Sequence, residues 1–350
     1  MTDLTTPDLE STALRQRSGL GQSLGVGTSG RAHAVWLVHR VAVAIAGLVA
    51  ISVLIFAATQ VLPGNAAVQL LGRNASPQNI RIVDQQLGLN RSLVQQYWTW
   101  AFRLLHGNLG ASLAGSHPRV GTIIGPALLN STVLVAFAVS ITIVVSLVWG
   151  IWAAVHRGRV SDIIFHGVTF LFTAVPEFVV GLVLVILFAT SVTSVLPAIS
   201  FIPAGTSPFA QLDAFVLPVT CLVLATMPYL ARLVRGSMID ELGSEYVRLA
   251  QLKGLSQRRV IFAHALPNAI VPAIQGTAVT FGYLAGGIVV VEYVFGFPGI
   301  GTIFLNAIDA RDVSTVQAAG LILASVYIVV NLLADLLVFR LSPRLWTATE

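Results

Sequence analysis

Charged residues gather in one stretch of an otherwise apolar chain, between Arg232 and His264. Across all 350 residues, 10% are charged and 55% are hydrophobic. Within the stretch, the residues from Glu245 to Lys253 place apolar side chains at helical spacing among charged ones, which predicts a short helix with one dry face. Such a helix can insert into a groove on a partner protein, and a solvated loop helix has the same pattern. Both interpretations stay open on the pattern alone.

Two residues after the short helix predict how the chain continues. Gly254 is expected to end the helix, because glycine readily adopts the left-handed conformation found at helix C-termini. Ser256 is a candidate N-terminal cap for a second helix that runs through His264 to Leu266 and Pro267. A continuing helix here would join the docking helix rigidly to the next apolar segment.

Three acidic residues lie within or beside apolar segments: Glu177, Glu292 and Asp335. A lone carboxylate in hydrocarbon costs roughly 3 kcal/mol, so each is expected to face the protein interior, a cavity or water. For Glu177, which follows Pro176 at an expected kink, and for Glu292, two alternatives stay open. Each either ties helices together by hydrogen bonds or contacts a transported substrate, so both are candidates for a translocation pathway. Asp335 is expected to pair with Arg340 or to reach the lipid headgroups.

The sequence shows no enzyme or metal site. It holds no phosphate-binding loop of the form G-x-x-x-x-G-K-[S/T] and no serine in a nucleophile elbow. His106 and His117 have no partner at metal-ligand spacing. The single cysteine, Cys221, cannot form an intrachain disulfide. We therefore expect a chain that binds no cofactor or metal and is not an enzyme.

The apolar segments define the fold class. Mean hydropathy is +0.83, and several uncharged runs reach the roughly 20 residues that cross a membrane as a helix. These runs lack the period-2 alternation of a β-barrel. We expect an all-α integral membrane protein with six transmembrane helices. The expected spans cover residues 41–58, 127–155, 163–190, 215–231, 270–295 and 316–338.

The basic residues predict the orientation. Arginine and lysine favour cytoplasmic loops. With both termini in the cytoplasm, 14 of the 20 basic residues fall on the cytoplasmic side and 6 on the other. Both termini are therefore expected to be cytoplasmic. The net charge of +5 follows from the same bias and does not indicate nucleic acid.

The chain divides into a disordered cytoplasmic tail (1–35), a membrane domain (36–343) and a C-terminal tail (344–350). The membrane domain includes an outer segment (63–125) and the charged loop (232–267). The outer segment predicts an amphipathic helix at 80–89, closed by Gly88, and a second helix at 93–105. The aromatic residues of the second helix indicate either an interfacial belt or a partner-facing outer cap.

The charged loop resembles that of permease subunits of binding-protein-dependent ABC importers. In that family the loop reads E-A-A, three residues, G, nine residues, I, one residue, L-P. Four positions of this chain match: Ala250, Gly254, Leu266 and Pro267. Arg248 replaces the glutamate, and His264 replaces the isoleucine. The sequence from Tyr246 to Gly254 resembles that of the peptide-transporting branch.

Further motifs of that branch follow in order over roughly residues 35–343. They are Leu62-Pro63-Gly64, Gly88-Leu89, Gln96-Tyr97-Trp98, Gly107-Asn108-Leu109-Gly110, Pro176-Glu177-Phe178, Glu292-Tyr293-Val294-Phe295, Phe297-Pro298-Gly299-Ile300-Gly301 and Arg311-Asp312. Asn108 is a departure, because the branch more often has aspartate there.

The resemblance implies a type I ABC importer permease fold in the cytoplasmic (inner) membrane of a bacterium. It implies three kinds of partner besides membrane lipid: a second homologous permease subunit, two cytoplasmic ATPase subunits that bind ATP and magnesium, and an extracytoplasmic substrate-binding protein. The ATPase-coupling residues would be Tyr246, Val247, Arg248, Leu249, Ala250, Gln251, Leu252, Lys253, Gly254 and Leu255. The substrates would be di- or oligopeptides, with nickel chelates, haem and glutathione as alternatives.

A stand-alone secondary transporter or channel is the alternative function. It requires coupling charges inside the membrane and commonly an inverted repeat. The sequence shows neither a clear repeat nor a paired-acid proton relay. The discriminating feature is dependence of transport on a separate ATPase.

Overall fold

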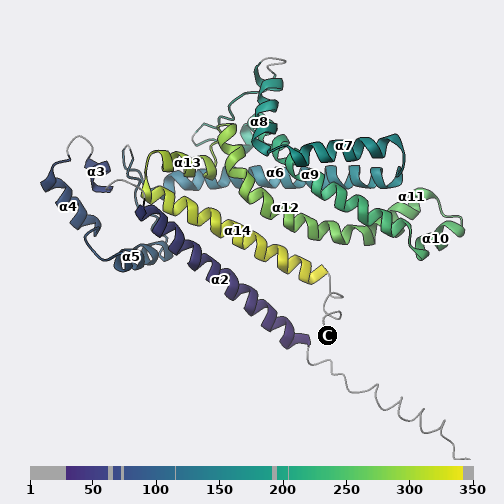
Figure 1. Cartoon of the computed structure of the whole chain (residues 1–350), viewed down its shortest axis with the longest axis horizontal. Coiled ribbons are helices and arrows are strands. Elements are labelled where there is room, and N and C mark those ends of the chain that lie inside the picture. The colour runs from purple at the N-terminus through teal and green to yellow at the C-terminus, as the bar shows by residue number, and fades with distance from the viewer. Residues whose placement is uncertain are drawn as a thin grey trace, which may run out of the picture. The chain divides into compact units, whose positions relative to one another are not determined.

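The computed structural model describes residues 29–61, 66–71, 75–114, 116–190, 195–203 and 205–341, and most of them are helical (Figure 1). Residues 1–28 of the expected N-terminal tail and the whole of the expected C-terminal tail (344–350) lie outside the described residues. The chain forms two compact units, Met1–Ala46 and Gly47–Glu350. In the first unit, the guanidinium of Arg40 lies 5.5 Å from the ring centre of Trp36.

The described helices have the following bounds. They are α2 (Ser29–Val61), α3 (Ala66–Leu71), α4 (Pro77–Leu87), α5 (Leu93–Leu105), α6 (Val120–Val155), α7 (Val160–Ala174), α8 (Glu177–Val185), α9 (Asp213–Leu242), α10 (Glu245–Leu252), α11 (Gln257–Arg259), α12 (Leu266–Val294), α13 (Ile300–Asp309) and α14 (Val313–Leu341). Two π-helical turns, Ile186–Thr190 and Val260–Ala265, extend α8 and join α11 to α12.

By length and composition, four of the described helices can cross a membrane: Val35–Gln60, Val120–Val155, Asp213–Leu242 and Val313–Leu336. Two bent pairs bring the number to six if each pair is one span. The first pair is Val160–Ala174 with Glu177–Ala189, and the second is Gln257–Leu284 with Gly286–Val294, which bends within α12. The expected all-α integral membrane protein is confirmed, and the four helices and two bent pairs lie at the six expected spans.

The third span differs from the expected kinked helix. The chain turns by 102° between α7 and α8. Pro176 lacks an N–H and restricts the residue before it to an extended conformation, and Val175 has ψ 126°. The α-helix therefore ends at Ala174 and restarts at Glu177.

The fourth span was predicted to end at Ala231, and that end is wrong. Helix α9 continues to Leu242, so Arg232 and Arg235 lie on the helix and not in the following loop. Both arginines bond to α7, and these contacts satisfy charges that the sequence pattern assigns to solvent.

Helix α9 is the central helix of the larger unit and packs against α6, α7, α8 and α12 (Figure 1). Small residues allow its close approach to α6. A Cβ on Gly150 of α6 would lie 2.7 Å from the carbonyl oxygen of Ala231. Nearer the middle of both helices, the buried hydroxyl oxygens of Thr142 and Thr226 are 3.0 Å apart.

The outer segment contains both predicted helices. Gly88 closes α4 with φ 71°, and α5 has the predicted bounds. On α5, the rings of Tyr97 and Trp100 pack against Phe56 of α2 with centroids 5.5 and 5.7 Å away. Trp98 and Leu105 are exposed, so an interfacial belt and a partner-facing cap both remain open for that side.

Candidate docking site around α10

Helix α10 has one face packed on the bundle and one face exposed. Val247 and Ala250, one helical turn apart, are buried in an apolar cluster with Met238 of α9 and Val260. Leu249 and Leu252 are 58% and 78% exposed. The predicted amphipathic helix is therefore present, and its outward face carries apolar surface beside charge.

The ten residues predicted for coupling all lie on α10 or the turn after it. Val247 and Ala250 point inward, and Leu255 is half-buried against the same cluster. The exposed members are Tyr246, Arg248, Leu249, Gln251, Leu252, Lys253 and Gly254. Gly254 has φ 77°, which confirms the predicted left-handed helix end.

Tyr246 joins α10 to the helices on both sides of it. Its hydroxyl donates to the carboxylate of Glu241 at the end of α9 and lies 3.3 Å from the carbonyl oxygen of His264. The same hydroxyl accepts from Nδ2 of Asn268 on α12 at 2.8 Å. One side chain of α10 therefore bonds to both α9 and α12.

The chain after Gly254 runs helically into α12, as predicted. Ser256 occupies the N-cap position of α11 but makes no side-chain cap bond. The π-helical turn Val260–Ala265 then leads into α12, and buried Val260, Ile261 and Ala265 hold it on the apolar cluster.

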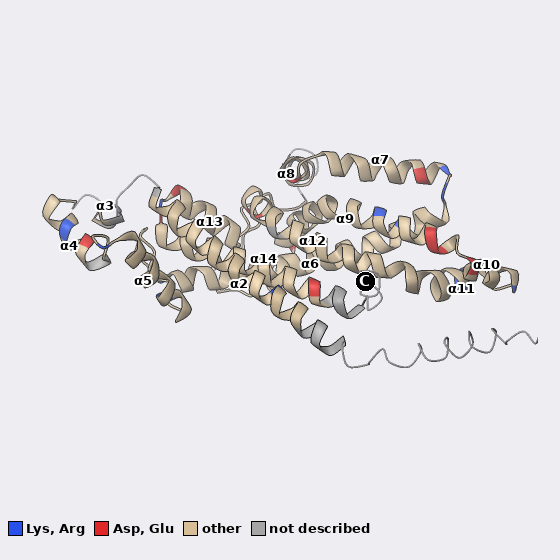
Figure 2. Cartoon of the chain, turned by 60° about the horizontal axis from the view of Figure 1, so that its bottom comes forward, with Lys and Arg blue, Asp and Glu red and all other residues tan. Residues whose placement is uncertain are grey.

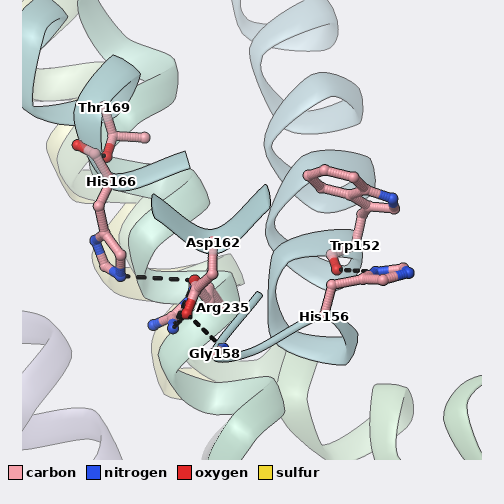
Figure 3. Close-up of polar contacts among 7 residues, drawn as sticks. All are labelled: Trp152, His156, Gly158, Asp162, His166, Thr169 and Arg235. Carbon is pink, nitrogen blue, oxygen red and sulfur yellow. Dashed lines mark hydrogen bonds and ion pairs between the residues drawn. The ribbon is translucent and has the colours of Figure 1, made fainter. Parts of the chain in front are cut away.

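A buried ion pair links α7 to α9 near the same end of the bundle (Figure 3). Arg235 Nε and one terminal nitrogen each donate to the Asp162 carboxylate at 2.9 Å, and the backbone N–H of Gly158 donates to it at 3.0 Å. The side chains of Arg235 and Asp162 are 15% and 12% exposed. Figure 2 shows acidic and basic residues concentrated where α7 and α9 meet α10. Bidentate pairing fixes the two helices in register.

Further contacts extend this link along α7. Arg232 donates to Thr173 Oγ1 at 2.8 Å and to the carbonyl oxygen of Thr169 at 3.3 Å. Nε2 of His166 lies 3.7 Å from Asp162. Helix α7 is thereby bonded to the part of α9 that leads directly into α10.

Glu292, on α12, is fully buried and bonds to two other elements, α6 and α13. Its carboxylate accepts from Ser131 Oγ of α6 at 2.5 Å and from the backbone N–H of Gly301 at 2.7 Å. Ser131 Oγ accepts in turn from the N–H of Ile300 at 2.9 Å. The carboxylate therefore holds the N-terminus of α13, where a negative charge is favoured. This geometry favours the helix-tying alternative over substrate contact.

Glu177 has a different environment. It is half-buried in the first turn of α8, directly after the 102° turn. Its side chain borders a hollow of about 620 Å³ together with residues of α12 and α14. This geometry leaves substrate contact open for Glu177. Asp335 is half-buried on α14, and the side chain of its expected partner Arg340 lies outside the described residues.

Three features of the site had no prediction: the Asp162–Arg235 pair, the Ser131 contact and α13. Asp162 lies close to Arg157 and Arg159 in sequence, and charged residues grouped in this way are typical of a solvated turn, so the pattern gave no sign of a buried ion pair. Helix α13 has ten residues, too few for a span. Among the described residues, no group of three His, Cys, Asp or Glu side chains is arranged to hold a metal ion.

A bundle of four to six membrane spans with an amphipathic helix at one end defines a multi-pass membrane protein. Residues 34–144 match the N-terminal family of binding-protein-dependent transport system membrane components, and residues 146–347 match the family of the inner membrane component itself. The chain belongs to this family, the permease subunits of ABC importers, which places it in the inner membrane of a bacterium. The expected permease fold class is confirmed.

Relatives cover most of the chain. A putative peptide transport system permease protein of Brucella suis is 33% identical over 308 residues, 88% of this chain and 98% of the relative. A probable peptide ABC transporter permease protein of Sinorhizobium fredii is 32% identical over 89% of this chain and 99% of its own. A glutathione transport system permease protein of Salmonella choleraesuis is 32% identical over 85% and 94%.

Proposed function

We propose that this chain is one transmembrane subunit of an ATP-driven importer that passes di- or oligopeptides across the cytoplasmic membrane by alternating access. The observation that carries the proposal is α10, whose inner face is packed on the bundle while Leu249 and Leu252 remain exposed. An exposed apolar face beside Arg248 and Lys253 suits a groove on a partner. The names of the relatives support the peptide class, since glutathione is itself a tripeptide.

The proposed assembly has a second homologous permease, two cytoplasmic ATPase subunits and an extracytoplasmic substrate-binding protein. ATP and magnesium bind to the ATPase subunits, and this chain binds neither. Closure of the ATPases moves α10, and Tyr246 passes the motion to α9 and α12. The Asp162–Arg235 pair passes it on to α7, so the helices on both sides of the bundle centre move together.

The first prediction concerns orientation, with both termini in the cytoplasm. In a Cys221→Ala background, Asn90→Cys is expected to react with a membrane-impermeant thiol reagent in intact cells. Ser256→Cys is expected to react only after permeabilisation. Both positions are exposed, and Ser256 makes no cap bond that a cysteine would remove. The opposite labelling pattern would overturn the orientation and the docking of α10 to cytoplasmic ATPases.

The second prediction tests coupling at Gly254. A β-branched residue at φ 77° costs about 1–2 kcal/mol and misdirects the chain between α10 and α11. In proteoliposomes with all subunits, Gly254→Val is expected to lower peptide uptake per ATP hydrolysed at least several-fold. Insertion into the membrane should be unchanged.

The matched control is Gly205→Val, because Gly205 also has a positive φ, 82°, and open space around its Cβ position, but lies in a loop before α9. It is expected to keep normal coupling. Equal losses in both variants would mean that backbone strain alone is responsible, and Gly254 would have no role in coupling. Peptide uptake without ATPase subunits would instead favour the stand-alone transporter.

A further inference from the structure

The hollow beside Glu177 is formed where three helices meet. Glu177 lies on α8, Gly282, Tyr283 and Gly287 lie on α12, and Tyr327 lies on α14. Its volume of about 620 Å³ is within the range of small-molecule sites. Glu177 is the one charged residue among the described residues that line it.

The glycines of α12 make room for the carboxylate. A Cβ on Gly287 would lie 2.5 Å from Oε2 of Glu177. Any larger residue at this position would therefore displace the carboxylate. Gly286, beside it, has nothing within 4 Å of its Cβ position. Gly287 therefore leaves room for the Glu177 carboxylate, and Gly286 leaves the space beside it open.

The Glu177 carboxylate has no hydrogen-bond or ion-pair partner within the described parts of the chain. Glu292, by contrast, is satisfied by Ser131 and Gly301. An ionised carboxylate in a membrane bundle needs a compensating positive charge or hydrogen-bond donors. A ligand in the hollow is positioned to supply the donors for Glu177.

Two tyrosines give the hollow aromatic sides. Tyr283 and Tyr327 are 60% and 46% exposed, although both lie in apolar helices. The Tyr327 ring borders Gly282, with Cε2 3.7 Å from the position of a Cβ there. Aromatic ring faces attract cations, and together with a carboxylate they recognise ammonium groups.

We propose that this hollow is a subsite for the terminal ammonium group of the transported peptide, with Glu177 as its counter-charge and Tyr283 and Tyr327 as its aromatic sides. The proposal rests on the proposed peptide import. It adds a residue that selects substrates inside the membrane, apart from the selection made by the binding protein. It also gives the two acids different roles, because Glu177 contacts the substrate and Glu292 holds the N-terminus of α13.

The test compares uptake of trialanine and N-acetyl-trialanine into proteoliposomes that contain the complete importer. The binding protein is supplied at concentrations that saturate it with either peptide. In the wild-type importer the ratio of free to acetylated uptake is measured first. Glu177→Gln is expected to lower this ratio about tenfold, which corresponds to ~1.4 kcal/mol. Uptake of the acetylated peptide reports whether the variant is folded and assembled.

Three further variants and a control sharpen the result. Glu177→Asp keeps the charge and is expected to retain most of the ratio, and Tyr327→Leu is expected to lower it a few-fold while Tyr327→Phe does not. Asp213→Asn, which removes an exposed acid outside the hollow, is the matched control and should leave the ratio unchanged.

The outcomes distinguish failure of the ammonium subsite from failure of the proposed peptide import. If Glu177→Gln lowers uptake of both peptides equally, the carboxylate pairs with a partner subunit or supports the fold, and the ammonium subsite is refuted. An unchanged ratio in Glu177→Gln also refutes it. If the wild-type importer moves neither peptide, the proposed peptide import fails, and the subsite fails with it.

Discussion

Glu292→Leu is expected to lower the free energy of unfolding by about 2–4 kcal/mol, because the N–H of Gly301 and the hydroxyl of Ser131 then lose their buried acceptor. Loss of this contact also frees the N-terminus of α13 from α6 and α12.

The single cysteine of the chain provides the measurement. Cys221 is fully buried on α9, so a thiol-reactive dye labels it only when the bundle opens. In detergent, Glu292→Leu is expected to label at a clearly lower temperature than the wild type. Glu292→Gln keeps an acceptor for Gly301 and a polar group for Ser131, and should fall between the two. Identical labelling curves for wild type and Glu292→Leu would show that the carboxylate contributes no stability.

The second large effect is expected at the Asp162–Arg235 pair. Asp162→Leu leaves the guanidinium of Arg235 without its counter-charge in a site that is 15% exposed. Removing one member of a buried pair typically costs 3–5 kcal/mol, and the partial exposure lowers this to roughly 2–3 kcal/mol. Arg235→Leu is expected to cost a similar amount, because Asp162 is then left with the N–H of Gly158 as donor.

The double variant Asp162→Leu/Arg235→Leu distinguishes an ion pair from two independent losses. Apolar replacement of a whole buried pair is often nearly neutral, so the double variant should regain much of the stability in the same Cys221 assay. Asp240→Leu, which removes an exposed acid on the same helix, is the control and should have little effect. Additive losses in the double variant would mean that the two residues act separately.

The same variants test the proposed transmission of motion. If the pair carries the motion of α10 to α7, the double variant should fold well yet import peptide more slowly at an equal rate of ATP hydrolysis. Full stability with full transport would mean that the pair does not carry the motion of α10 to α7.

Local signals determined much of the fold. The predicted bounds of α5 match, and the predicted helices ended by Gly88 and Gly254 both end there in the left-handed conformation. Helical periodicity, glycine at helix ends and long apolar runs act over a few residues, so the sequence alone displays them. The six spans and the amphipathic α10 were predictable for the same reason.

The environments of the charged residues depended on tertiary structure. Asp162 meets Arg235 across 73 residues of sequence, and Glu292 meets Ser131 across 161. From sequence, Arg232 and Arg235 indicated the end of a span, yet α9 continues because α7 supplies their partners.

The sequence pattern did not distinguish Glu177 from Glu292. In the fold, Glu292 bonds to α6 and α13, and Glu177 lies beside an open hollow. Whether a charge in a membrane helix is satisfied depends on side chains that only the packed bundle brings within about 3 Å. The sequence by itself therefore determined the class, the positions of the spans and the amphipathic helix α10. The packing of α6, α7, α9 and α12 decided the environment of each buried charge.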